Sequence, residues 1–347
     1  GFPPFPGNPV YVLLIRFFVF LGFADYQALA LPSILSCSIA IFPLFNIAKR
    51  IFGVREAYAA AILFALHPGL LSFSLLPGSD AVLIFPLLLG VRLTLRTAFI
   101  SREEREKTRF ISQYAGSAVF AFSIGLSGKA AFLIIIPLTL ALISALKLKS
   151  FSAISETLNG CLIGLSIWVL PYLMIYSISD LLLHTTTAEP LFESAVLTIS
   201  ERSTSLFWGL IYYGYSFNES KIAGLISAFF LLATIIPGTV RTLHSRGLTH
   251  IAVPTGILVL YAIKSSFPDR PDNYSLLFPF MILIAAGGLT FSPFTTARHA
   301  ATITVALLTI TFLTSRVTTI HNGKTEMMQT IDYLKDICPE GDCVVLS

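Results

Sequence analysis

Apolar and polar residues alternate in long blocks along this chain, which predicts hydrophobic helices joined by short polar turns. Residues 31–47 are apolar, the next turn holds Lys49, Arg50 and Arg55, and a second apolar block covers residues 57–73. Such blocks fit helices that cross a bilayer, whose hydrocarbon core needs about 20 helical residues. Continued along the chain, the pattern predicts ten spans at about residues 28–48, 56–73, 81–98, 111–127, 131–147, 154–176, 221–240, 249–265, 275–292 and 299–314.

The segments outside these spans divide the chain into three predicted parts. Residues 1–27 combine a Pro-rich loop with a short apolar stretch around Arg16, which predicts a helix lying in the membrane interface. Residues 28–314 form the transmembrane domain, with a long connection at 177–220. Residues 315–347 have a helical and then a strand-like pattern, which predicts the start of an α/β domain that the sequence truncates.

The composition supports an integral membrane protein. Only 12% of residues are charged, 55% are hydrophobic and the mean hydropathy is +0.80. This is too few charged residues to cover the surface of a protein in water. Most of the protein surface is therefore expected to face lipid. The net charge of +4 is small, and we expect no nucleic-acid partner.

The basic residues predict how the helices are oriented, because Lys and Arg in short loops are retained on the cytoplasmic side. With the 49–55 turn inside, fourteen of the 23 Lys and Arg residues share its face: Lys49, Arg50, Arg55, Arg92, Arg96, Arg102, Arg105, Lys107, Arg109, Lys147, Lys149, Arg241, Arg246 and Arg298. Residues 102–109 are interpreted as one of these cytoplasmic turns. Both ends of the sequence then lie outside, so we expect a fragment that lacks at least one helix before Gly1.

Several stretches resemble the GT-C membrane glycosyltransferases, in particular the branch with protein O-mannosyltransferases and the lipid A aminoarabinose transferase. They are the Pro-rich start, Leu31-Pro-Ser-Ile-Leu35, Ala48-Lys-Arg-Ile-Phe-Gly53, His67-Pro68, the loop ending in Asp80, Ile124-Gly-Leu-Ser-Gly-Lys-Ala130 and Asp272-Asn-Tyr-Ser-Leu-Leu-Phe-Pro279. The resemblance covers most of residues 1–290. It implies transfer of a sugar from a polyprenyl-phosphate carrier to an acceptor on the outer or lumenal face. It also implies that the main catalytic acid residue precedes Gly1.

Four residues are candidates for this chemistry, which needs a carboxylate to activate an acceptor hydroxyl and cations to hold the leaving phosphate. Asp80 begins a helix on the expected outer face, where it is either a helix cap or a carboxylate on the acceptor or metal side. Lys129 either binds the carrier phosphate or extends to the membrane surface. Arg270 and Tyr274 lie where the family has a phosphate-contacting Arg-Tyr pair, although Asn273 here interrupts that pattern.

Other polar residues have simpler interpretations. His67 stands alone on an apolar helix and is expected to be a hydrogen-bonded structural residue. Cys338 and Cys343 lie outside by this topology and are either a disulfide or two free thiols.

The sequence therefore predicts an all-α polytopic membrane protein of GT-C type, with an interfacial helix and the start of an extracytoplasmic α/β domain. Its partners would be the bilayer, a polyprenyl-phosphate-linked sugar and an acceptor that is a protein, lipid or glycan. A transporter of lipid-linked sugars and a non-catalytic subunit with the same fold are the alternatives. The residues leave open the sugar, the carrier and the use of a divalent metal.

Overall fold

The computed structural model describes residues 8–67, 70–71, 74, 79–95, 102–148, 151–173, 234–235, 237–245, 248–265 and 276–289. Its helices are α1 (Pro9–Phe20), α2 (Asp25–Ile51), α3 (Val54–Ala65), α5 (Ser79–Val82), α6 (Ile84–Leu95), α7 (Arg102–Phe122), α8 (Ile135–Leu148), α9 (Ser152–Leu173), α13 (Leu248–Ser265) and α14 (Phe278–Leu289). Two short 3₁₀ helices, η2 (Ser123–Gly125) and η3 (Gly128–Ile134), connect α7 to α8. The described residues contain no strand, which confirms the all-α fold for this part.

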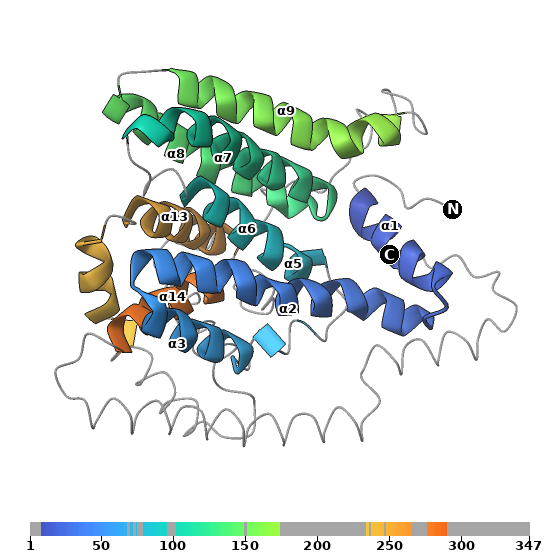
Figure 1. The fold of residues 1–347 in the computed structure, drawn as a ribbon. Coiled ribbons are helices and arrows are strands. Elements are labelled where there is room, and N and C mark those ends of the chain that lie inside the picture. The colour runs from blue at the N-terminus through green and yellow to red at the C-terminus, as the bar shows by residue number, and fades with distance from the viewer. Residues whose placement is uncertain are drawn as a thin grey trace, which may run out of the picture.

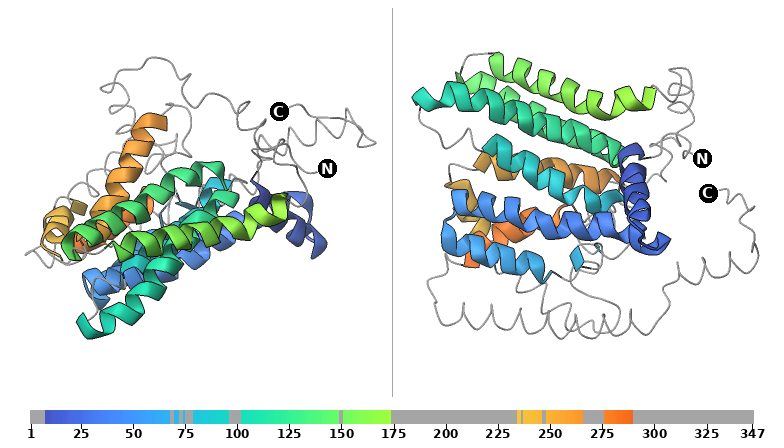
Figure 2. Two further views of the ribbon diagram at one scale, coloured as in Figure 1. Left: turned by 90° about the horizontal axis from the view of Figure 1, so that it is seen from above. Right: turned by 45° about the vertical axis from the view of Figure 1, so that its right-hand side comes forward.

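The helices form a bundle with distinct ends. Most of them run side by side, and α1 lies across one end, as Figure 1 and Figure 2 show. The position of α1 in the membrane interface stays a prediction. The opposite end of α2 continues through Gly53 into α3, and Gly53 has φ +118°, a conformation that residues with a side chain rarely adopt. We call these the α1 end and the basic-turn end of the bundle.

The helix boundaries agree with most predicted spans and differ at two. In the span expected at 56–73, helix α3 ends at Ala65, just before His67 and its following proline, because a residue before proline is disfavoured in the helical conformation. Leu70, Leu71 and Ser74 are helical again. Helix α7 begins at Arg102, so residues 102–109 are part of a helix and the interpretation as a turn was wrong. The Glu103 to Lys107 spacing of four residues is one that supports a helix. The span at 299–314, the connection at 177–220 and the domain expected from residue 315 lie outside the described residues. Of the span at 221–240, only residues 234–235 and 237–240 are described.

Two of the described helices are long and apolar enough to cross a membrane: Gln27–Ile51 and Ser152–Leu173. Shorter apolar helices are Pro9–Phe20, Ile84–Leu95, Ala130–Leu146, Leu248–Ala262 and Phe278–Leu289. The number of segments that cross the membrane stays a prediction.

Some polar side chains are paired between the helices, while many large apolar side chains lie on the surface in addition to those in the core. Gln113 donates through Nε2 to Thr157 Oγ1 at 3.0 Å, and both residues are buried between α7 and α9. The outer face of α9 exposes Leu158, Leu162, Ile163, Ile167 and Leu170. This distribution is typical of helices that associate in lipid, because exposing apolar side chains to lipid carries no hydrophobic penalty.

Small residues allow α7 and α9 to approach closely. A Cβ atom on Gly160 would overlap the Tyr114 carbonyl oxygen and Ser117 Oγ, and one on Gly164 would overlap the Ala118 carbonyl oxygen. The two helices run parallel, since Gln113 meets Thr157 while Trp168 Nε1 donates to Ala121 O at 3.4 Å further along. The glycines four residues apart in α9 therefore set the distance between these helices.

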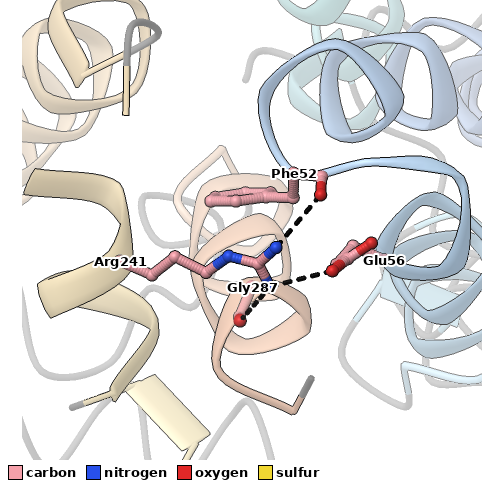
Figure 3. A network of polar contacts seen from close by, with 4 residues as sticks. All are labelled: Phe52, Glu56, Arg241 and Gly287. Atoms are coloured by element: carbon pink, nitrogen blue, oxygen red, sulfur yellow. Dashed lines mark hydrogen bonds and ion pairs between the residues drawn. The ribbon is translucent and has the colours of Figure 1, made fainter. Parts of the chain in front are cut away.

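At the basic-turn end, one arginine joins three parts of the chain (Figure 3). Arg241, in the helical residues 237–243, pairs through Nη1 with Glu56 Oε1 at 2.8 Å. The same guanidinium donates to Gly287 O and Phe52 O, both at 3.1 Å, and lies 5.6 Å from the Phe52 ring centroid. The Glu56 side chain is only 10% exposed. This cluster fastens α14 and residues 237–243 to the turn between α2 and α3.

The close contact of Gly160 in α9 with helix α7 gives the first testable prediction. Replacing Gly160 with Ala should lower the free energy of unfolding by about 1–3 kcal/mol, because the added methyl group has no space beside α7. The matched control is Gly256→Ala in α13, where nothing lies within 4 Å of the new Cβ. That variant should be unchanged or more stable by about 0.5–1 kcal/mol. Unfolding in mixed detergent micelles measures both, and equal stability of the two variants would contradict the assignment.

The Arg241 cluster gives a second prediction. Arg241→Met should cost about 3–5 kcal/mol of unfolding free energy, because it leaves the Glu56 carboxylate buried without its cation. The double variant Glu56→Gln/Arg241→Met should lose less than the two single losses added together. Lys49→Met, an exposed residue close to the same turn, is the control and should change stability by less than about 0.5 kcal/mol. Additive losses would show that the two side chains act independently.

Candidate functional site

Two of the predicted site residues lie on short elements towards the α1 end: Lys129 in the η2–η3 connection and Asp80 in α5. The start of α1 is the third piece of chain in this region. Each is short or irregular, so contacts with neighbouring helices must hold it. We treat this end of the bundle as the candidate functional site.

Helix α1 is fixed to α2 through a buried tyrosine. The Tyr11 hydroxyl donates to Leu29 O at 3.0 Å, and Tyr11 is 9% exposed. Burial raises the pKa of the Tyr11 phenol, so the hydroxyl keeps the proton that it donates. The contact places the start of α1 beside the first turns of α2.

The other side of α1 holds the η2–η3 connection. Asn8, just before α1, accepts through Oδ1 a hydrogen bond of 3.1 Å from the Gly128 amide. A Cβ atom on Gly125 would overlap Val10 of α1 and Trp168 of α9, so these residues pack directly on the η2 backbone. Lys129 follows Gly128, and its backbone is therefore positioned at the α1 end.

Helix α5 is held against α2 by one serine. Ser36 Oγ donates to Val82 O at 2.7 Å and accepts from the Phe85 amide at 3.2 Å. The Phe85 amide is in the first turn of α6, where backbone N–H groups have no partner within their own helix. A side chain of α2 thus joins the end of α5 to the start of α6. This contact positions the backbone of Asp80 in α5. Ser36 lies about two helical turns along α2 from Leu29, the residue that binds Tyr11 of α1.

The start of α14 lies beside the segment that follows α3. The His67 ring lies 4.6 Å from the Phe278 ring, centroid to centroid, with 38° between the planes. At the other end of the same two helices, Gly287 shares a guanidinium with Phe52. Helices α3 and α14 are therefore antiparallel, and α14 begins beside the segment that leads from α3 towards α5.

The remaining predicted site residues lie outside the described part of the chain. These are Arg270, Tyr274, Cys338 and Cys343. The described residues contain no group of three or more His, Cys, Asp or Glu side chains that could hold a metal ion. The roles of Asp80 and Lys129 stay predictions, since the structure gives only the position of their backbone.

Comparison with known proteins identifies the family. Residues 4–176 match the model of the dolichyl-phosphate-mannose-protein mannosyltransferase family. The fold is similar to the crystal structure of ArnT from Cupriavidus metallidurans in the apo state, with a TM-score of 0.57 and 13% sequence identity. That similarity covers 81% of this chain and 49% of ArnT, so the chain spans about half the length of that protein. No curated protein sequence matches the chain significantly.

Residues 4–176 thus match a family of GT-C membrane glycosyltransferases, and the chain has the fold of a GT-C protein. This result confirms the resemblance inferred from the Pro-rich start, the His67-Pro68 pair and the Asp80 loop. It also makes the chain part of an integral membrane protein, as its composition indicates.

Sequence reasoning missed the residues that hold the segments of this candidate site in place. Asn8, Tyr11 and Ser36 were not singled out, although each bonds to a segment distant in the sequence. A signal was present in Ser33 and Ser36, which are polar, three residues apart in an apolar helix, and both buried. Small polar residues at this spacing in a membrane helix mark a face that packs against other helices.

The serine contact gives a third prediction. Ser36→Ala should lower the free energy of unfolding by about 1–3 kcal/mol, because the Phe85 amide loses its acceptor in a buried site. The control is Ser38→Ala on the exposed face of α2, where Ser38 Oγ bonds only to Ile34 O of its own helix in the contacts observed. That change should stay within about 0.5 kcal/mol. Amide exchange at Phe85 should rise in the Ser36 variant alone, and unchanged exchange would contradict the capping role.

Proposed function

We propose that the protein transfers a sugar from a polyprenyl-phosphate carrier to an acceptor at the non-cytoplasmic face of the membrane. The observation that supports this most directly is the position of α1, α5 and η3 at one end of a GT-C bundle. Basic residues of the turn between α2 and α3 lie at the opposite end, together with Arg241. By the distribution of Lys and Arg in membrane proteins, that opposite end would face the cytoplasm.

In the proposed reaction, an acceptor hydroxyl attacks the anomeric carbon of the sugar. A new carbon–oxygen bond forms as the bond from that carbon to the phosphate oxygen breaks, and the bonding electrons leave with the polyprenyl phosphate. A carboxylate takes the hydroxyl proton. We assign Asp80 to the acceptor or metal side of this site, and the main catalytic carboxylate to a position before residue 1.

Lys129, Arg270 and Tyr274 would hold the phosphate that leaves. A guanidinium binds two phosphate oxygens at once, and a lysine supplies a compact positive charge. Both stabilise the negative charge that develops on the leaving group more than they stabilise the bound donor. The 177–220 connection and a domain from residue 315 would complete the outer side of the site.

A transporter of lipid-linked sugars is the main alternative. It would need ionisable groups or broken helices near the middle of the bilayer. The buried pair of Glu56 and Arg241 lies at the start of α3, beside a turn, and not at mid-helix. Helix α2 is continuous from Asp25 to Ile51 although it contains Pro32 and Pro43. These features favour the transferase.

The fourth prediction concerns the donor. Purified full-length protein should bind decaprenyl phosphate at least about tenfold more tightly than decaprenol, which has the same tail without the charge. Arg270→Ala and Lys129→Ala should each weaken phosphate binding about tenfold, whereas Lys49→Ala at the opposite end should not. Native mass spectrometry or tryptophan fluorescence measures the dissociation constants. Equal binding of the alcohol and the phosphate would overturn the proposed donor.

A fifth prediction concerns the transfer of the sugar to the acceptor. Asp80→Asn should leave decaprenyl phosphate binding unchanged and reduce sugar transfer from labelled polyprenyl-phosphate sugars by roughly a hundredfold. Membranes that contain the protein supply the acceptor. Transfer at the normal rate would remove Asp80 from the mechanism without affecting the proposed donor.

A further inference from the structure

Helix α9 lies along one edge of the bundle and has two unlike faces (Figure 1). It packs on α7 and α8, and its Gly160 and Gly164 lie against the α7 backbone. The face turned away from α7 carries residues at steps of four, three and four, which keeps them within about 60° of one another around the helix. We call these residues the outer ridge of α9: Ser155, Asn159, Leu162 and Ser166.

Asn159 is the unusual residue of the outer ridge. Its side chain is exposed, and its neighbours Leu158, Leu162 and Ile163 are exposed apolar residues. No hydrogen bond from its carboxamide to another described residue is observed. A carboxamide has two N–H donors and an accepting oxygen, and such groups are costly in hydrocarbon without a partner.

The position of Asn159 along α9 places it in the apolar part of a bilayer. Helix α9 has 22 residues and is about 33 Å long, close to the roughly 30 Å of the hydrocarbon core. Asn159 comes seven residues after Ser152, about 10 Å along the helix. Its side chain is much shorter than that of a lysine or arginine and does not reach the headgroups from this depth.

The depth and the chemistry of Asn159 together define a matching partner. All copies of a membrane protein insert with the same orientation, so the two-fold axis of a dimer is parallel to the membrane normal, and two α9 helices on that axis run parallel. In a symmetric contact of this kind, a residue near the axis meets its own equivalent at the same depth. Two carboxamides are complementary, since the N–H group of each donates to the oxygen of the other.

We propose that the outer ridge of α9 binds α9 of a second copy of this chain, with the two Asn159 carboxamides bonded to each other. The rest of the ridge fits a helix partner. Ser155 and Ser166 are small and allow close approach, and Ser166 Oγ donates to Ile163 O of its own helix at 2.9 Å. A single asparagine in an otherwise apolar helix contact also fixes the register of the two helices.

This proposal requires that α9 spans the bilayer, and it does not depend on sugar transfer. Helix α9 would lie between two partners, with Gly160 and Gly164 against α7 of its own copy and the outer ridge against the other copy. The exposed apolar side chains beside the ridge would then contact lipid and the second helix.

The first test measures dimer formation by the full-length protein in phosphatidylcholine bilayers, by energy transfer between labelled copies over a range of protein-to-lipid ratios. Asn159→Leu should raise the dimer dissociation constant about tenfold, and Asn159→Gln, which keeps the carboxamide, should stay within about threefold of wild type. Asn46→Leu in α2 is the control, because Asn46 Nδ2 donates to Phe42 O of its own helix at 2.8 Å. Monomeric wild-type protein at every ratio, or equal dimerisation of Asn159→Leu, would overturn the proposal.

The second test locates the contact by cross-linking in protein whose own cysteines are replaced by serine. With copper phenanthroline as oxidant, Asn159→Cys should form a disulfide between two copies. Leu158→Cys should link at least about fivefold less, because Leu158 has nearly the same depth and is 49% exposed but points about 100° away. Equal yields at the two positions would overturn the proposal. A thiol of Asn159→Cys that neither cross-links nor reacts with maleimide would also overturn it, because another segment of the same chain would then cover the ridge.

Discussion

The contact on which the described bundle most depends is the one between Arg241 and its three oxygen partners. The Arg241 side chain is only 26% exposed, and a guanidinium largely withdrawn from water is costly unless its charge and its N–H groups are satisfied. Here the Phe52 and Gly287 carbonyls come from the ends of α2 and α14, where backbone carbonyls lack partners within the helix. Glu56 supplies the negative charge from the first turn of α3, where the helix dipole also favours a carboxylate. The Arg241 side chain thus binds two carbonyl groups at the ends of α2 and α14 and a carboxylate at the start of α3.

This constraint explains how the two ends of the bundle differ. At the basic-turn end, the chain is held by a charged cluster and by a close glycine contact between Gly238 and Gly288. At the α1 end, short elements are held by hydrogen bonds of Asn8, Tyr11 and Ser36 with neighbouring segments. Segments held by few contacts open at lower cost than the rest of a protein. A site that must admit a lipid-linked donor and release a product suits that end of the molecule.

The sequence predicted the long elements well, because their signal is local. The apolar blocks correctly gave α1, α2 and α9, and the family resemblance gave the fold. The cluster around Arg241 was not predictable in the same way. The distribution of charges assigned Arg241 to the same side as the 49–55 turn, but its partners are far away in sequence and depend on how the helices pack. Asp80 and Lys129 were chosen by chemistry, and Arg270 and Tyr274 by resemblance, so their roles remain predictions.

The surface of the bundle connects this architecture with the proposed donor. Large apolar side chains on α9 face outward, while Gln113 and Thr157 are paired inside, so the environment that suits the bundle is lipid. A polyprenyl phosphate has an apolar tail that dissolves in the bilayer and a charged head that stays at its surface, since a charge is costly in the hydrocarbon core. Such a molecule reaches the ends of transmembrane helices and not their middle. The site proposed at the α1 end, beside a helix that lies across the bundle, would therefore stand at the depth where the reactive head of the proposed donor is expected.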